Sequence, residues 1–148
     1  MRIYSMFVIS VLLLSGCNRQ LEEERQAYVE EVTSKTESYL SVKEGFDVYF
    51  ELFISGELTE KDELKNKSQL ALQSVKATIE ELQQITVPKI TTKYHQDLLD
   101  SYELQQKFLE ELLLHLETDH NEKSVLDYYK KVNEKQKELT KDMIKLNH

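Results

Sequence analysis

Hydrophobic side chains recur along most of the chain at alternating spacings of four and three residues. Side chains at this spacing share one face of an α-helix, so the pattern predicts helices that each turn one apolar stripe toward a common core. After residue 16, Gly45 and Gly56 are the only glycines and Pro88 is the only proline, which indicates long helices. We therefore expect an all-α, antiparallel up-down-up-down four-helix bundle, because helices of similar length joined by short connections pack as antiparallel neighbours.

The first two predicted helices cover residues 21 to 54 and 57 to 85. Gly45 interrupts the first at a cost of about 1 kcal/mol relative to alanine, and Ser55-Gly56 ends it. The predicted core stripes are Tyr28, Val32, Lys35, Tyr39, Val42, Phe46, Tyr49 and Phe53 in the first helix, and Leu64, Ser68, Ala71, Val75, Thr78, Leu82 and Ile85 in the second. Beside the first stripe, Val29, Leu40, Phe50 and Ile54 are expected to widen it.

The third and fourth predicted helices cover residues 88 to 117 and 122 to 148. Pro88 separates the second and third helices, because proline disfavours the helical conformation in the residue before it and suits a first turn. The predicted core stripes are Thr91, His95, Leu98, Tyr102, Gln105, Leu109, Leu112 and Leu116 in the third helix, and Val125, Tyr129, Val132, Gln136, Leu139, Met143 and Leu146 in the fourth.

The first sixteen residues form a segment of a different kind. Positive charge at Arg2, a short apolar run and small residues follow one another in the order typical of a signal peptide. The apolar run, residues 3 to 14, is shorter than the roughly 20 residues that a membrane-spanning helix requires. At its end, Leu14-Ser15-Gly16-Cys17 resembles the lipobox of bacterial lipoproteins. The resemblance implies that the chain is cut before Cys17 and that Cys17 carries a diacylglyceryl anchor.

This resemblance implies a domain order: residues 1 to 16 are a removed signal peptide, 17 to 20 a lipidated cysteine and short tether, and 21 to 148 the helical bundle. Two acyl chains on Cys17 give stable anchoring, so the expected partner is the membrane and the expected location is extracytoplasmic, on the outer face of the cytoplasmic membrane. The proline, histidine and spaced leucines of residues 88 to 102 also resemble small, functionally uncharacterised helical lipoproteins of Gram-positive bacteria.

The net charge is −8, and loss of residues 1 to 16 would leave 18 basic and 27 acidic side chains, a charge of −9. This acidity disfavours binding to nucleic acid and recruitment by an anionic membrane. The charge is unevenly spread: residues 21 to 54, 57 to 85, 89 to 120 and 122 to 148 carry −6, −2, −4 and +2. The basic fourth helix is therefore expected to lie between the acidic first and third helices.

The sequence contains no phosphate-binding glycine loop, nucleophile motif or histidine pair at metal spacing. A single Glu-x-x-His element, Glu117 to His120, matches part of a di-iron site, which requires two such elements and further glutamates. We therefore predict no catalytic residue, no metal site and no cofactor. With no cysteine after Cys17, the fold must be stabilised by its apolar core.

Several polar side chains interrupt the apolar stripes at heights that an antiparallel bundle would bring together. Buried polar groups require partners, so these residues either make structural hydrogen bonds or line a polar slot for a small ligand. Lys35 is one such interruption, and the candidate binding residues are Tyr39, His95, Tyr102, Gln105 and Gln136.

Three functions fit the sequence. We expect a non-catalytic interaction module that works beside a membrane or envelope protein, which would leave an apolar stripe exposed near Phe50, Ile54, Leu113 and Tyr128. A ligand-binding bundle and a structural spacer are the alternatives. The sequence leaves the oligomeric state open, because long helical hairpins that dimerise would show the same stripes.

Overall fold

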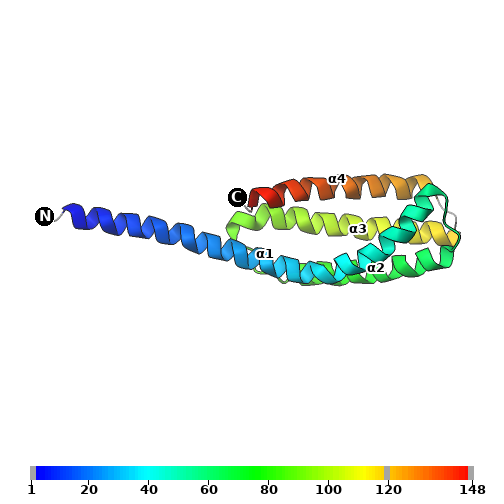
Figure 1. Ribbon diagram of the computed structural model, residues 1–148, viewed down its shortest axis with the longest axis horizontal. Coiled ribbons are helices and arrows are strands. Elements are labelled where there is room, and N and C mark those ends of the chain that lie inside the picture. Colours follow the sequence, from blue (N-terminus) through cyan, green and yellow to red (C-terminus); the bar gives the residue numbers. More distant parts are fainter. Residues whose placement is uncertain (1–2, 119–120, 147–148) are drawn as a thin grey trace.

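The computed structural model describes the backbone of residues 3–118 and 121–146 and the side chains of residues 19–118 and 121–144. Its elements are α1 (Ile3–Ser55), α2 (Lys61–Leu82), the short 3-10 helix η1 (Lys89–Thr91), α3 (Thr92–Thr118) and α4 (Glu122–Leu146). Successive α-helices run in opposite directions and pack side by side (Figure 1). The predicted all-α bundle is therefore confirmed.

The first helix starts earlier than expected. We predicted a start near Leu21, whereas α1 is one continuous helix from Ile3, and its amino-terminal part projects beyond the other three helices (Figure 1). The proposed signal peptide and the side chain of Cys17 lie outside the described side chains, so the lipobox remains a prediction. Within the described residues, no helix is both long and apolar enough to cross a membrane.

Local sequence explains where α1 ends and α3 begins. The amides of Gly56 and Glu57 donate to the carbonyls of Phe53 (3.1 Å) and Leu52 (2.9 Å), which is the hydrogen-bond pattern of a Schellman motif. Gly56 has a φ of +74°, a left-handed conformation that glycine adopts without steric cost. At the other end of the bundle, Pro88 is extended and separates α2 from α3 as predicted. The third helix was expected to begin at about residue 88, whereas η1 follows Pro88 and α3 begins at Thr92.

The core forms along the predicted stripes. All seven stripe residues of the second predicted helix are buried, as are the first seven of the third. Aromatic rings of α1 cross the core to α3: the centroid of Phe108 lies 6.0 Å from that of Phe46 and 5.1 Å from that of Phe50. The expectation that Phe50 lies on an exposed stripe is wrong, because its side chain is 1% exposed. Ile54 is exposed, whereas Leu113 and Tyr128 are half-buried.

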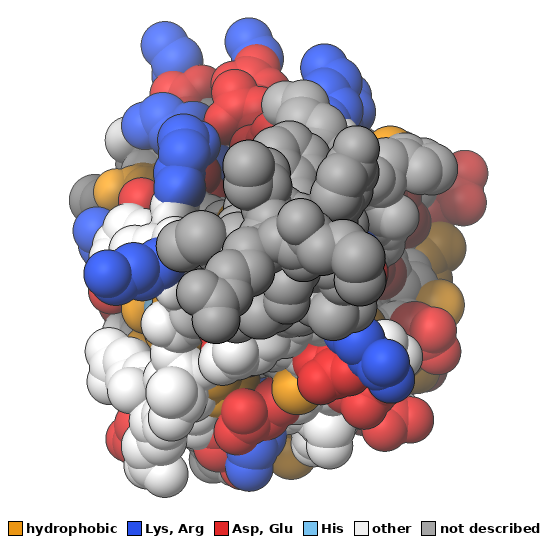
Figure 2. Space-filling model, turned by 90° about the vertical axis from the view of Figure 1, so that its left-hand side faces the viewer, with side chains coloured by type: hydrophobic (Ala, Val, Ile, Leu, Met, Phe, Trp, Pro, Cys, Tyr) orange, Lys and Arg blue, Asp and Glu red, His pale blue; other side chains and the backbone are white. Residues whose placement is uncertain are grey.

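The fourth helix packs mainly on α3. The backbones of α1 and α2, of α2 and α3, and of α3 and α4 lie close together. In contrast, α4 contacts α1 through Tyr129, whose ring centroid lies 4.8 Å from that of Phe50. The basic α4 pairs with acidic α3 as its charge predicted, through Lys135 and Asp97. Its lysines gather along the upper edge of the end view (Figure 2). The other predicted neighbour of α4 is α1, and α4 contacts α1 only along part of its length.

Candidate functional site

Because α4 packs mainly on α3, a groove of about 650 Å³ opens between α1 and α4. Its floor comes from α3, including Leu98 and Tyr102, and its rims include Leu40 of α1 and Met143 and Ile144 of α4. Leu40 and Ile144 are 52% and 54% exposed. We call this space the α1–α4 groove. Its rims expose apolar side chains that the bundle itself does not cover.

The groove narrows toward the connections α1–α2 and α3–α4. There it continues into a smaller hollow of about 90 Å³ that Asn133 and Phe108 help to line. It closes where the ring of Tyr129 packs on Phe50 and its hydroxyl donates to Glu51 across 3.3 Å. The groove is therefore elongated along the bundle and wider toward the carboxyl end of α4.

Four of the five candidate binding residues line the groove: Tyr39, Tyr102, Gln105 and Gln136. The hydroxyl of Tyr39 donates to Oε1 of Gln105 across 2.5 Å, and the ring of Tyr39 packs edge-on against Tyr102 with centroids 5.4 Å apart. Gln136 is half-buried at the α4 wall. The structure therefore brings these four residues together around the groove, where Tyr39 and Gln105 bond to each other.

The fifth candidate, His95, does not reach the groove. It is buried at the end of the bundle from which α1 projects, where its Nδ1 lies 3.1 Å from the hydroxyl of Tyr28. Burial lowers the pKa of His95. The Tyr28–His95 pair therefore matches the structural hydrogen bond that we weighed against a ligand slot.

The tyrosines at the floor remain neutral over the physiological pH range. Burial raises the pKa of Tyr94 and of Tyr102 to about 12, and it raises the pKa of Tyr39 further still. A phenol with so high a pKa is a poor general base near neutral pH. The floor of the groove can donate and accept hydrogen bonds, but it offers no proton-transfer group of matched pKa.

The rim of the groove on α1 is acidic. Glu44, Asp47 and Glu51 line it together with a single cation, Lys43, and Lys43 is already paired with Asp47 one turn away. The α4 residues that line the groove carry no charge. A cationic occupant is therefore favoured over an anionic one such as a fatty-acid carboxylate.

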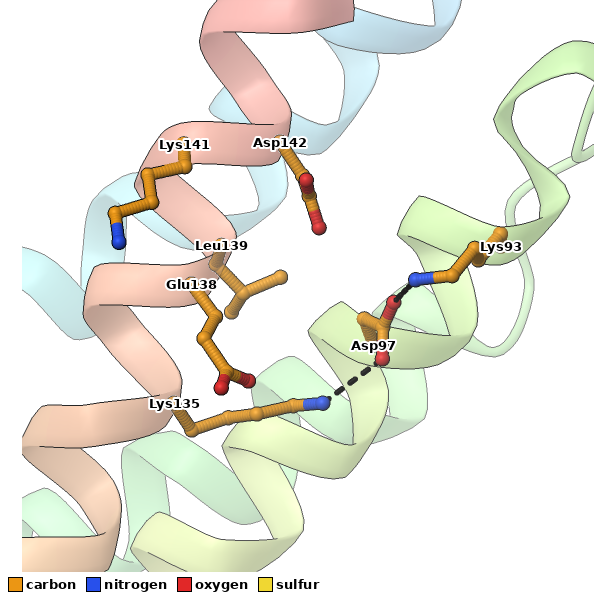
Figure 3. A pocket seen from close by; sticks show the side chains of 7 residues that line it. All are labelled: Lys93, Asp97, Lys135, Glu138, Leu139, Lys141 and Asp142. Carbon is orange, nitrogen blue, oxygen red and sulfur yellow. Dashed lines mark hydrogen bonds and ion pairs between the residues drawn. The ribbon is translucent and has the colours of Figure 1, made fainter.

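A second hollow, of about 310 Å³, lies between α3 and α4 (Figure 3). Asp97 accepts from Lys135 (2.8 Å) and from Lys93 (2.7 Å), and these bonds lower the pKa of the Asp97 carboxyl. Lys141 extends away from this ion pair (Figure 3). The cluster ties α3 to α4 and its charges already compensate one another. Across the described side chains, no group of three or more metal-binding residues comes together.

Sequence reasoning missed the residues that make the groove a surface feature. Leu40 lies one position from the α1 stripe and was expected to widen the core, yet it is 52% exposed. Ile144 follows Met143 in the same way on α4. Such an apolar residue at the edge of a stripe is the signal that could have indicated an open seam.

Comparison with known proteins found no matching family model, no similar curated protein and no similar solved structure.

Proposed function

We propose that the protein is a lipid-anchored lipoprotein of the outer face of the cytoplasmic membrane, and that its helical bundle acts by binding and not by catalysis. The anchor is supported by the signal layout and by the lipobox-like Leu14-Ser15-Gly16-Cys17. Cys17 is therefore the proposed attachment site.

The observation that carries the binding role is the α1–α4 groove. Its rims expose Leu40 and Ile144 beside a floor of buried apolar and aromatic side chains. Exposed apolar surface that is contiguous and rimmed by polar groups marks interaction sites in soluble domains. Because the hydroxyl of Tyr39 is already bonded to Gln105 and apolar and aromatic side chains line the groove, it supports recognition by shape and apolar contact.

A small-ligand site in the same groove is the second candidate. The groove volume of about 650 Å³ lies within the range of ligand pockets. Gln136 makes no side-chain hydrogen bond to any part of the chain that the structure describes, so its amide is available to a ligand. The open length of the groove and its exposed rims favour a macromolecular partner over an enclosed ligand.

The anchor is tested by Cys17→Ser in the full chain. We expect incorporation of a labelled fatty acid to be lost and processing between Gly16 and Cys17 to stall or shift, so that chain cleaved elsewhere leaves the membrane. A second variant, Ser15→Ala, serves as the control. It should still incorporate the labelled fatty acid, because small residues suit this position of a lipobox. Wild-type protein that incorporates no fatty acid would contradict the anchor.

The binding role is tested by a photo-reactive amino acid at Leu40 in the membrane-bound protein. Leu70, 53% exposed on α2, is the matched control because α2 contributes nothing to the groove. We expect one defined protein adduct from position 40 and none from position 70. Adducts from neither position would favour the spacer alternative, and a small molecule retained in native mass spectrometry would favour the ligand site.

A further inference from the structure

The α1 helix carries a second stripe beside the groove, on the outward side of its core stripe. Its members follow one another at spacings of four and three residues, so they share one helix face. The end residues Leu40 and Ile54 are 52% and 40% exposed, and the three residues between them are acidic. The α1 stripe is Leu40, Glu44, Asp47, Glu51 and Ile54.

The α4 helix carries a matching stripe on the other side of the groove. Leu126 and Ile144 are 40% and 54% exposed at its ends, and the residues between them are polar or basic. Asn133, Thr140 and Ile144 line the groove, which fixes the direction of this face. The α4 stripe is Leu126, Lys130, Asn133, Lys137, Thr140 and Ile144.

The two stripes are complementary but do not meet within one copy. The part of α1 from Leu40 to Glu51 and the part of α4 from Asn133 to Ile144 each extend about 17 Å along the groove. Leu40 lies at the same end of the groove as Ile144, because both line its wider part. No ion pair joins α1 to α4 among the described side chains, and Lys137 and Glu44 both remain exposed.

We infer that a second copy of this chain occupies the groove, with α4 of each copy packed along the α1 stripe of the other. The inference rests on the proposed binding role of the groove and names its partner. A basic, amphipathic helix complements the acidic rim, and α4 is the one described α-helix with net positive charge. Complementary charges of this kind set the choice and orientation of helical partners.

A two-fold axis along the length of the bundle satisfies these contacts. Each α1 then lies between its own α4 and the partner's α4, and all neighbouring helices are antiparallel. The same patch is used on both copies, as in other two-fold dimers. Both amino termini leave the dimer on the same side, which suits two lipid anchors in one membrane. An axis across the bundle would place the anchors at opposite ends.

The test uses two full-length chains with different tags, expressed together and kept in the membrane. One chain carries Leu40→Cys and the other Ile144→Cys, so a short bis-maleimide can join these positions only between copies. We expect a mixed-tag dimer from this pair. Leu70→Cys, of similar exposure on α2, replaces Leu40→Cys in the control and should give only background.

Charge reversal tests the chemistry of the contact. Glu44→Lys in all chains should reduce the mixed-tag dimer roughly fivefold, since an attraction becomes a repulsion. Adding Lys137→Glu to the same chains should restore the dimer. Both side chains are exposed, so the fold should tolerate these changes.

The outcomes separate this inference from the proposed function. Equal cross-linking of the Leu70→Cys control, or no rescue by Lys137→Glu, would overturn the two-fold dimer. Absence of a mixed-tag dimer, together with capture of a different protein from position 40, would overturn self-association and leave the binding role intact. Absence of every adduct at position 40 would overturn both.

Discussion

At the scale of single residues, tyrosines of α1 join the helix to α3 through polar contacts inside the core. Tyr28 reaches His95 and Tyr39 reaches Gln105, each across a sequence separation of more than 60 residues. Within the described side chains, no buried nitrogen or oxygen lacks a hydrogen-bond partner. An unpaired buried polar group costs more than a formed hydrogen bond contributes, so these pairs fix which layers of α1 and α3 face each other.

His95 makes the stability of the bundle depend on pH. Burial lowers its pKa in the folded protein below the ordinary value of about 6.5, so the unfolded chain binds a proton more readily as the pH falls. The free energy of unfolding should therefore decrease from about pH 7 toward about pH 5. Denaturant titrations at several pH values measure this slope. His95→Gln should flatten it, whereas Tyr28→Phe should lower stability and keep the slope; an unchanged slope in His95→Gln would contradict the assignment.

The bond between Tyr39 and Gln105 should appear as an energetic coupling. Tyr39→Phe leaves Oε1 of Gln105 without its donor and should cost about 1–3 kcal/mol. In the double variant Tyr39→Phe, Gln105→Leu, the loss should be smaller than the sum of the single losses by about 1 kcal/mol. Tyr128→Phe is the control, because Tyr128 is half-buried and makes no hydroxyl bond to a described residue. Strict additivity in the double-mutant cycle would show that the pair is not coupled.

At the scale of elements, α1 combines two structural roles along one continuous helix: one part packs into the core and the other projects from the bundle. Its carboxyl-terminal part carries the aromatic core residues, while its amino-terminal part projects from the bundle (Figure 1). Near the start of the described side chains, ion pairs and hydrogen bonds link residues one turn apart, including Arg19 with Glu23 and Gln20 with Glu24. Each such pair adds only a few tenths of a kcal/mol. Together they support the part of α1 that projects beyond the other helices (Figure 1).

Gly45 within α1 and Gly56 immediately after it predict opposite effects of the same added methyl group. Gly45 lies in the helix interior with no atom within 4 Å of an added Cβ, so Gly45→Ala should stabilise the protein by about 0.5–1 kcal/mol. Gly56 has a φ of +74°, so Gly56→Ala should destabilise it by about 1 kcal/mol. Chemical denaturation of both variants measures the difference. A destabilising Gly45→Ala would mean that the helix needs flexibility at this position.

At the scale of the whole molecule, the bundle is unequally packed. Seven side chains of α2 are buried, from Leu64 to Leu82, whereas among the described side chains of α4 only Val125, Val132 and Leu139 are. Burial of apolar surface is the main stabilising contribution to a helix in a protein. The α4 helix is therefore the least firmly held part of the described bundle, and it is also the helix that borders the groove.

This difference predicts an order of local opening. In hydrogen exchange at a concentration where the protein is monomeric, amides of α4 should exchange through opening of lower free energy than amides of α2. Val132→Ala should increase the difference in opening free energy between α2 and α4, because it loosens the packing of α4. Val75→Ala should instead lower the stability of the whole bundle. Equal protection of α2 and α4 would show that α4 closes on α1 in solution, which would remove the groove.

The sequence alone was sufficient for the number and order of the α-helices and for the core positions of α2 and α3. Strict four-three spacing identified the buried positions of α2 and α3, because a helix period leaves one face for burial. Gly56 and Pro88 marked helix boundaries through backbone sterics that depend only on neighbouring residues. The charge of α4 also predicted its pairing with α3. Each of these properties is local, or repeats along the helix, and can be read without knowing the packing.

Only the tertiary structure decided which helices close on one another. A stripe says which face of a helix is buried, but the separation of α1 and α4 depends on the aromatic rings that hold α1 above α3 and on the layer at which Tyr129 meets Phe50. For this reason Phe50 was misplaced at the surface and Leu40 in the core, and His95 was grouped with residues that it does not join. The groove exists because three helices satisfy most of the core, which leaves α4 without enough apolar surface to close the fourth side.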